Sequence, residues 1–458
     1  MLSPTDGLYL AQVFEGGVLA TGATGSGKSS TLAHLMAAMM RRDFGMVIIT
    51  AKGSDWSDIE RIARWAGRER DLLRFCKEKP WRFDFLQHEL ASQGGSISTG
   101  SQLMQDLLNI ATRMKAENAR DPFWPQSAAR QMRMAMTAIL LATGTCSVSG
   151  IYRFVTSLPT SLALTKDAKW KASAYCLRIL IAAEERHPHR DDLDMAAEYV
   201  LSEFPAQGEK TAATITSTSM NVLEKLLSGD IGRLVSSGET NISPADAIDG
   251  RIIVVDAPPL IYRDEGTLVG ACWKLSAMRT FQRRDLAVNS RPVCLWVDEA
   301  QLSAIPSVDS MFAATCRSSC CANVAITQNI NLLESVFGSK EDARAWISNL
   351  QTKFIFANSD AETNAYFSHM FGESRQHLIS VSPDNKPFDL VGHMLGEPQG
   401  VGMNLNEQFL PQVRPEEFLR LRKGGRDNNF VVDCFITQGG RVFSNGKTWL
   451  KTSFTQRV

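Results

Sequence analysis

The chain has 458 residues, of which 44% are hydrophobic and 21% are charged, a composition typical of a folded globular protein rather than a disordered one. Its length exceeds that of most single domains, so we expect a large core with one inserted or appended domain. Lysine plus arginine equals aspartate plus glutamate, and the resulting net charge of zero excludes a protein that coats DNA over its whole surface. Any contact with nucleic acid must therefore be local, as in the lining of a channel.

The sequence also shows no sign of a membrane-spanning helix or of a signal peptide. No stretch approaches the roughly 18 consecutive apolar residues that a membrane-spanning helix requires. The N-terminus has neither the basic start nor the apolar run of a signal peptide. The nine cysteines lack the paired spacing of metal ligands, which predicts free thiols in a reducing compartment. We therefore expect a cytoplasmic protein.

The first segment predicts a strand, a loop, a helix and a second strand. Val18–Ala20 is a short apolar run, and a glycine-rich stretch follows it from Gly22 to Ser30. Apolar residues then recur at helical spacing up to Met39, and Met46–Ile49 predicts the next strand. A βαβ start of this kind indicates a parallel sheet covered by helices.

The character of the sequence changes between about residues 100 and 235, where runs of β-branched residues are nearly absent and four segments have helical periodicity. We therefore predict an all-α domain over 100–235, inserted into an α/β nucleotide-binding domain formed by 1–99 and 236–458. The four predicted helices are Gln102–Met114, Pro125–Thr143, Asp191–Phe204 and Thr211–Leu227.

Strand-like runs return after residue 236, and the helical intervals between several of them predict that they extend the same, mostly parallel sheet. Near the C-terminus, two short runs around a Gly-Gly turn predict a small β element at the sheet edge, Phe430–Ile436 and Arg441–Phe443. The other predicted strands are Arg251–Asp256, Val293–Val297, Asn323–Thr327 and Thr352–Phe356, and the helical intervals include Thr267–Arg284 and Lys340–Leu350.

The glycine-rich stretch fits the motif GxxxxGK[ST], in which each position has a physical role. Its glycines allow a tight turn whose backbone N–H groups point at phosphate oxygens, next to the positive end of the following helix. Lys28 can reach the β- and γ-phosphates, and the hydroxyl of Ser29 can bind Mg²⁺. We therefore expect ATP and Mg²⁺ as ligands. The expected nucleotide-binding residues are Gly22, Ala23, Thr24, Gly25, Ser26, Gly27, Lys28, Ser29 and Ser30.

A second, acidic part of this site lies far along the chain. The buried strand predicted at Val293–Val297 is followed directly by Asp298 and Glu299. In this position Asp298 can hold the Mg²⁺ shell, and Glu299 can orient and deprotonate the attacking water. Together with the glycine-rich loop, this pair predicts an ATPase in which Lys28 and Glu299 contribute to catalysis.

Two polar residues follow the acidic pair. Gln328 ends the next predicted strand, so it should emerge at the same sheet edge as Asp298, where it can contact the γ-phosphate or the water. The alternative is a polar cap of the strand. Arg317 lies in a segment typical of a helix end and a turn, and it is a candidate arginine finger. The alternative for Arg317 is a surface salt bridge.

Several stretches, spread over most of the chain, are similar to one family of motors. GATGSGKSS and VIITAKGSD resemble its P-loop and next strand, although Thr50 stands where the family has an acid before Lys52 and Gly53. DPFWPQSAARQMRMAMTAIL resembles the entry into its all-α domain. LWVDEAQ, CRSSCCANVAITQN and ISNLQTKFIFANSDAETNAYFSHMFGE resemble its Walker B strand, its arginine and glutamine motif, and the strand and helix that follow. The family is the TraG/TraD-like coupling-protein ATPases of conjugation and type IV secretion, within the FtsK/HerA motor class.

The resemblance implies a RecA-like P-loop NTPase core with an inserted all-α domain. It implies a homo-hexamer around a channel for single- or double-stranded DNA, and an all-α domain that recognises a relaxase or another relaxosome protein. Residue by residue it implies the roles given above, with Gln328 as γ-phosphate sensor and Arg317 reaching into the neighbouring subunit's site. Lys52 and Arg233 are candidate loop cations, with a solvated surface position as the alternative.

Members of the family have N-terminal membrane helices, so the resemblance implies a place at the inner membrane. The chain would reach it through a membrane segment absent from this sequence, through a small membrane protein, or through components of the secretion channel. The leading prediction is therefore a coupling ATPase that pumps DNA or protein-linked DNA in conjugation or type IV secretion. The alternatives are a HerA/FtsK-like DNA motor in repair, defence or packaging, and a coupling ATPase for protein effectors.

Overall fold

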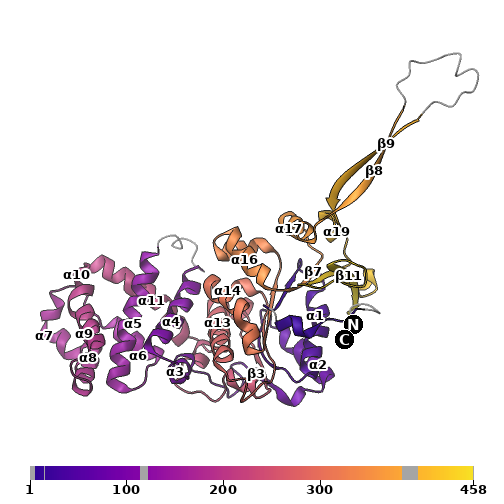
Figure 1. The fold of residues 1–458 in the computed structure, drawn as a ribbon. Coiled ribbons are helices and arrows are strands. Elements are labelled where there is room, and N and C mark those ends of the chain that lie inside the picture. The colour runs from indigo at the N-terminus through magenta and orange to yellow at the C-terminus, as the bar shows by residue number, and fades with distance from the viewer. Residues whose placement is uncertain (1–5, 15, 114–121, 384–400, 457–458) are drawn as a thin grey trace, which may run out of the picture.

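The computed structural model of the protein describes residues 6–14, 16–113, 122–383 and 401–456. At its centre lies a nine-stranded sheet in the order β11-β10-β7-β1-β6-β5-β2-β4-β3 (Figure 1). The strands from β7 to β3 in this order are parallel, whereas β10 is antiparallel to both β7 and β11. The predicted α/β fold with a mostly parallel sheet is thereby confirmed. The strands are β1 Val18–Thr21, β2 Gly45–Ile49, β3 Leu72–Phe75, β4 Ile252–Val255, β5 Val293–Val297, β6 Cys321–Thr327, β7 Thr352–Phe356, β10 Val431–Gln438 and β11 Trp449–Thr455.

Helices cover both faces of the sheet, which explains why β2, β4 and β5 are apolar at every position. Along β2, Met46 and Ile48 pack in the cluster that contains α1 and α2, whereas Val47 and Ile49 pack in the cluster on the other face. Alternate residues of a strand point to opposite faces, so a strand covered on both sides needs apolar side chains throughout. The helices are α1 Lys28–Arg41 and α2 Asp55–Ala66 on one face, and α13 Pro259–Arg283, α14 Pro306–Thr315 and α16 Lys340–Asn349 on the other.

The segment between β3 and β4 forms an all-helical block, seen to the left of the sheet in Figure 1. Within the described residues, no single helix has the length and apolar composition of a membrane span; α5 and α6 meet these criteria only as a pair bent by 114°. The predicted helix Asp191–Phe204 is interrupted by a π-helical turn at Tyr199–Glu203. The helices are α3 Phe85–Ala91, α4 Ile97–Arg113, α5 Phe123–Thr143, α6 Val148–Thr156, α7 Ala168–Ser173, α8 Tyr175–Arg186, α9 Asp191–Glu198, α10 Phe204–Ala206 and α11 Glu209–Leu227.

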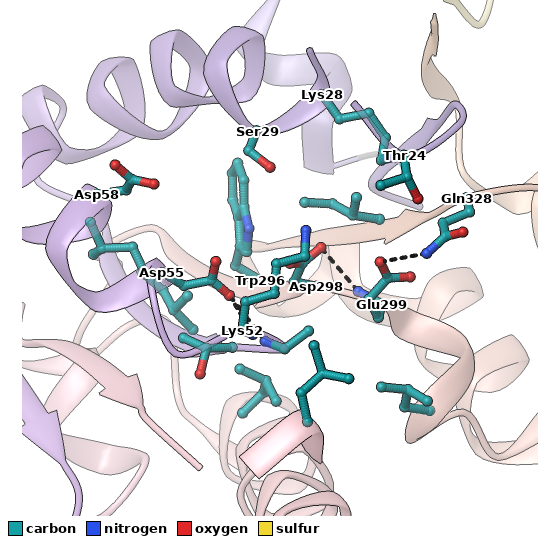
Figure 2. Close-up of a pocket in the computed structure, with 18 of the residues that line it drawn as sticks. Thr24, Lys28, Ser29, Lys52, Asp55, Asp58, Trp296, Asp298, Glu299 and Gln328 are labelled. Carbon is teal, nitrogen blue, oxygen red and sulfur yellow. Dashed lines mark hydrogen bonds between the residues drawn. The ribbon is translucent and has the colours of Figure 1, made fainter. Parts of the chain in front are cut away.

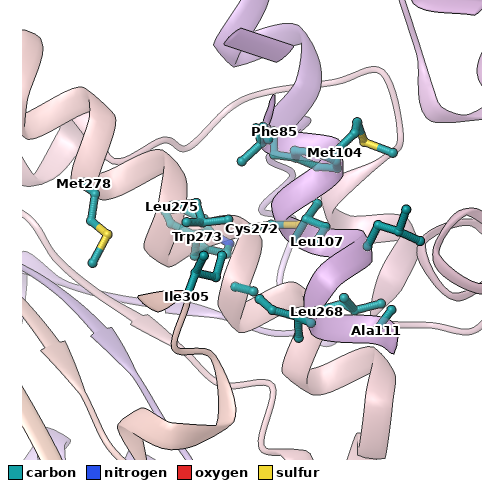
Figure 3. Packing of buried hydrophobic residues seen from close by; sticks show 14 of the residues in the cluster. Phe85, Met104, Leu107, Ala111, Leu268, Cys272, Trp273, Leu275, Met278 and Ile305 are labelled. Carbon is teal, nitrogen blue, oxygen red and sulfur yellow. The ribbon is translucent and has the colours of Figure 1, made fainter. Parts of the chain in front are cut away.

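Helix α13 joins the helical block to the sheet. Every residue of α13 from Gly266 to Met278 is buried, because the sheet lies on one side of the helix and α4 and α11 lie on the other. Figure 3 shows the contact with α4, in which Leu107 lies beside Cys272. Ion pairs border this contact: Glu89 of α3 accepts from Arg283 at 2.7 Å and lies 3.2 Å from Arg279. The block therefore packs firmly on the sheet domain through one helix.

The C-terminal β element differs from the prediction in its second strand. Arg441–Phe443 is not a strand, because the Arg441 N–H donates to Gln438 O at 3.1 Å in a turn and its guanidinium lies over the ring of Tyr9. The strand that pairs with β10 is instead β11, Trp449–Thr455. The predicted turn at Gly439 and Gly440 is present, but the connection between the two strands continues beyond it to residue 448.

Two strand features were absent from the predictions. The edge strand β3 was missed, and so was a second sheet, the antiparallel hairpin of β8 Glu373–Pro383 and β9 Val401–Pro411. This hairpin projects away from the core on the side opposite the helical block (Figure 1). The remaining helices in this part of the chain are α15 Ile330–Phe337, α17 Ala361–Phe371 and α19 Pro415–Leu419.

Candidate nucleotide site

The carboxyl ends of the central parallel strands bring distant parts of the chain together. The Gly22 N–H donates to Gln328 O at 3.1 Å, and the Asp298 N–H donates to Ile49 O at 3.1 Å. The loop after β1 therefore lies beside the end of β6, and the acidic pair after β5 lies beside the end of β2. One cavity of about 1150 Å³ opens at this edge (Figure 2). The predicted residues that line it are Thr24, Gly25, Ser26, Gly27, Lys28, Ser29, Ser30, Asp298, Glu299 and Gln328.

The glycine-rich loop depends on two residues without a side chain. Gly25 and Gly27 have φ values of 74° and 84°, in the left-handed region that favours glycine. A Cβ atom on Gly27 would also lie 2.4 Å from Cγ2 of Val432 at the start of β10. The loop is therefore shaped both by its own backbone and by a strand from the far end of the chain.

Helix α1 presents a positive end to the cavity. It starts at Lys28, its N-cap Gly27 provides no side-chain acceptor, and its first turn contains no acidic residue. The N–H groups of this turn are therefore available to an anion. The Lys28 ammonium donates to the loop carbonyls of Gly22 and, at 3.2 Å, Ala23. Burial lowers the pKa of Lys28, and Glu299 opposes this effect.

Asp298 and Glu299 lie in different environments. Burial, together with the charge of Asp55, raises the pKa of Asp298 to about 6. Glu299 has a φ of 48°, an uncommon conformation for a residue with a side chain, which aims its carboxylate across the cavity. Its Oε1 accepts from Gln328 Nε2 at 3.1 Å and its Oε2 accepts from Gln301 Nε2 at 2.7 Å. Two amides thus hold this carboxylate in place.

These residues fit a nucleotide with a magnesium ion. The Ser26 hydroxyl is almost fully buried beside the loop and has no hydrogen-bond partner among the described residues, as expected of a group that awaits a ligand. The Ser29 hydroxyl and the Asp298 carboxylate line the same cavity, and both are oxygen donors of the kind that Mg²⁺ prefers. The loop, the helix terminus and the acidic pair therefore supply complementary parts of one site.

Arg317 lies at the opposite end of the sheet from this cavity. It belongs to the 3-10 helix Cys316–Ser319, which precedes β6, whereas Gln328 follows β6. Because β6 spans seven residues at about 3.3 Å each, the two positions are separated by roughly 23 Å. Arg317 is exposed and is not one of the described residues that line the cavity. Any contact of Arg317 with a nucleotide must therefore be with one bound by another chain.

The two candidate loop cations, Lys52 and Arg233, lie in different surroundings. Lys52, in the loop after β2, lines the nucleotide cavity. Its position could have been expected, since it follows β2, the neighbour of β5 in the sheet. Arg233 is exposed, and its Nε donates to Leu227 O at 3.2 Å, which corresponds to the surface alternative. Cavity side chains that the sequence did not indicate include Asp55, Asp58, Arg263, Gln301 and Gln456.

Comparisons with known proteins agree with this arrangement. Residues 292–402 match a family model described as the TraM recognition site of TraD and TraG. This segment contains Asp298, Glu299, Arg317 and Gln328. A comparison with curated protein sequences finds no match.

Solved structures share the fold over nearly the whole chain. The bacterial conjugative coupling protein TrwBdeltaN70 in its unbound form has a TM-score of 0.60 and 16% identity, covering 98% of this chain and 86% of that one. The plasmid coupling protein TrwB in complex with the non-hydrolysable GTP analogue GDPNP has a TM-score of 0.61 and 16% identity, covering 98% and 88%. TrwB in complex with ADP and Mg²⁺ has a TM-score of 0.61 and 15% identity, covering 98% and 87%. These matches confirm the resemblance found in the sequence: the chain has the fold of a conjugative coupling protein and contains a TraD/TraG-type segment.

Proposed function

We propose that the chain is an ATP-hydrolysing coupling protein that pumps DNA or protein-linked DNA in conjugation or type IV secretion. The main support is that Lys28 and the pair Asp298 and Glu299, distant in sequence, line one cavity at the carboxyl edge of a parallel sheet. The relatives described above as complexes with GDPNP and with ADP and Mg²⁺ support nucleotide as the ligand.

In the proposed reaction, Lys28 exchanges its two loop carbonyls for the β- and γ-phosphate oxygens. Ser29 and Asp298 hold the magnesium ion, which neutralises charge on the phosphates. Glu299 orients the attacking water and accepts its proton. Gln328 donates to Glu299, so it is placed to respond when a γ-phosphate enters beside that carboxylate.

The proposed working form is a homo-hexamer in which each site needs two chains. Its support is the position of Arg317, exposed at the sheet end opposite the cavity of its own chain. In a ring this end of one subunit can face the nucleotide of the next, where the guanidinium stabilises negative charge in the transition state. The hexamer encloses the channel through which DNA passes.

The proposed partners are DNA, a relaxase or another relaxosome protein, and components of the secretion channel or a small membrane protein. The match of residues 292–402 to a TraM recognition segment supports a relaxosome partner. We place the chain on the cytoplasmic side of the inner membrane, bound through such a partner or through an anchor outside this sequence.

The decisive experiment measures the ATPase rate per subunit against protein concentration, with and without DNA and at several salt concentrations. We expect a rate that rises with concentration as rings assemble, rises further with DNA, and loses its DNA stimulation as salt increases. Lys28→Ala should abolish turnover. A rate that ignores DNA but responds to a secreted protein would favour the effector-coupling alternative, and no turnover under any condition would refute an ATPase.

A further inference from the structure

The edge of β2 lacks the carboxylate that the family resemblance would place there. Thr50 occupies that position, and its hydroxyl donates across the sheet to Val255 O at 3.0 Å. This bond uses the hydroxyl within the sheet, and Thr50 is only 3% exposed. Mg²⁺ in nucleotide sites is commonly held by one or two carboxylates together with the phosphates. A second carboxylate could therefore bind the cation together with Asp298.

Asp55 is positioned to be that group. It is the first residue of α2, and its Oδ2 accepts from the N–H groups of Ala51 at 3.1 Å and Lys52 at 2.9 Å. These bonds fold the loop after β2 back on itself and fix the direction of the carboxylate. Oδ1 accepts no hydrogen bond from any described residue, and Figure 2 shows the Asp55 carboxylate directed toward Asp298. The side chain therefore has one oxygen held by the backbone and one left for the cavity.

Lys52 lies on the same loop and reaches into the same space. In Figure 2 its side chain extends from below toward Asp298. Asp55 and Lys52 are both close enough to Asp298 for their charges to act on it, with opposite signs. A lysine ammonium thus lies near two carboxylates, in a position where a divalent cation could take its place as their counter-ion.

We propose that Asp55 is the second carboxylate of the divalent-cation site and holds the ion or its water shell jointly with Asp298. This inference rests on the proposed function, because the cation enters with the nucleotide. Lys52 balances the two carboxylates until the cation arrives and is displaced from them by it.

Asp58 provides a matched control on the same helix. Its carboxylate also borders the cavity, but it accepts from Arg61 at 2.9 Å, and Figure 2 shows it turned away from Asp298. Asp58→Asn and Asp55→Asn remove the same charge one helical turn apart. Only the second removes a group that faces the cation position.

The test measures binding of a fluorescent ADP analogue to the full chain as Mg²⁺ is titrated, and again in EDTA. For Asp55→Asn we expect an unchanged affinity in EDTA and a loss of about 10-fold or more in Mg²⁺ affinity, the scale seen when a ligand-supporting group is removed. Asp58→Asn should behave as the wild type. Electron paramagnetic resonance of Mn²⁺ in the ADP complex should show a changed spectrum for Asp55→Asn alone.

A second variant distinguishes loss of the cation ligand from a folding defect. Asp55→Ser keeps an oxygen that can accept the loop N–H groups, as serine does at helix starts, and should show the same loss of Mg²⁺ affinity. Wild-type Mg²⁺ titrations for both Asp55 variants would overturn this inference and leave the proposed function standing. Failure of the wild type to bind nucleotide at all would instead refute the proposed function.

Discussion

Gln328 donates its side-chain amide to Oε1 of Glu299 at 3.1 Å, so the residue expected to sense the γ-phosphate is bonded to the residue expected to activate water. The two follow different strands, β6 and β5, which are neighbours in the sheet. A shift of either side chain therefore changes the other. Binding of nucleotide beside Glu299 would be transmitted directly to the end of β6.

Replacing Glu299 with glutamine should separate binding from turnover. The amide keeps the shape of the side chain but cannot accept a proton from water, so we expect hydrolysis to fall by roughly 10²- to 10⁴-fold. ATP affinity should stay within a few-fold of the wild type. Single-turnover hydrolysis and equilibrium binding measure the two effects, with Glu341→Gln on the exposed start of α16 as control. Rapid turnover in Glu299→Gln would remove this residue from its role.

Replacing Arg317 with alanine should affect hydrolysis only in the assembled protein. We expect normal ATP binding by dilute protein and a loss of turnover of about 10³-fold or more, the scale of known arginine fingers. A mixture of Arg317→Ala and Glu299→Gln chains should recover partial activity, because some interfaces then combine an intact Arg317 with an intact Glu299. Each variant alone, at the same total concentration, is the control. No recovery at any mixing ratio would argue against action across subunits.

The stability of the empty protein should depend on pH through Asp298. Its pKa is raised from 3.8 to about 6, chiefly by burial, so the folded state binds this proton more tightly than the unfolded state. The contribution is fully present below pH 4 and is lost as the pH rises through 6, a difference of roughly 3 kcal/mol. Asp298→Asn should therefore stabilise the empty protein at pH 8 and have little effect at pH 4. Denaturant unfolding at both pH values, without nucleotide or Mg²⁺, tests this; equal effects at both would contradict it.

A buried ion pair ties α13 to the segment after the acidic pair. Lys274 Nζ lies 2.7 Å from Asp309 Oδ2 and donates to Ser303 O at 2.8 Å, and both charged side chains are almost fully buried. Lys274→Met should lower the free energy of unfolding by about 3 to 5 kcal/mol, because it removes the ammonium that pairs directly with a buried carboxylate.

Two comparisons make this stability prediction specific. The double variant Lys274→Met, Asp309→Asn should recover part of the loss, since it removes the uncompensated charge. Lys340→Met breaks an exposed ion pair with Glu362, 2.9 Å in length, and should cost less than about 1 kcal/mol. Urea unfolding of all three measures the differences. A loss for Lys274→Met no greater than that for Lys340→Met would show that the buried pair adds little.

The sequence by itself determined the elements whose signals are local. Strands β2, β4 and β5 are apolar at every position because both faces of the sheet are covered, and β2, β4, β5, β6 and β7 lie where the strand-like runs predicted them. The turn residues, the lysine and the hydroxyls of the glycine-rich loop are consecutive, so their chemistry can be read without a fold. Strands at the edges were harder to predict from the sequence. β3 and the β8–β9 hairpin have mixed polar and apolar residues, as strands with exposed positions do.

Only the tertiary structure decided which side chains share the cavity and which lie at the opposite edge of the sheet. Gln328 and Arg317 lie at the two ends of β6, and the direction of that strand alone puts one in the site and the other outside it. Lys52 and Asp55 enter the cavity because β2 is the neighbour of β5, a pairing between segments more than two hundred residues apart. A periodicity describes the faces of one element, whereas strand order is set by the packing of all of them together, and a site at the sheet edge depends on that order.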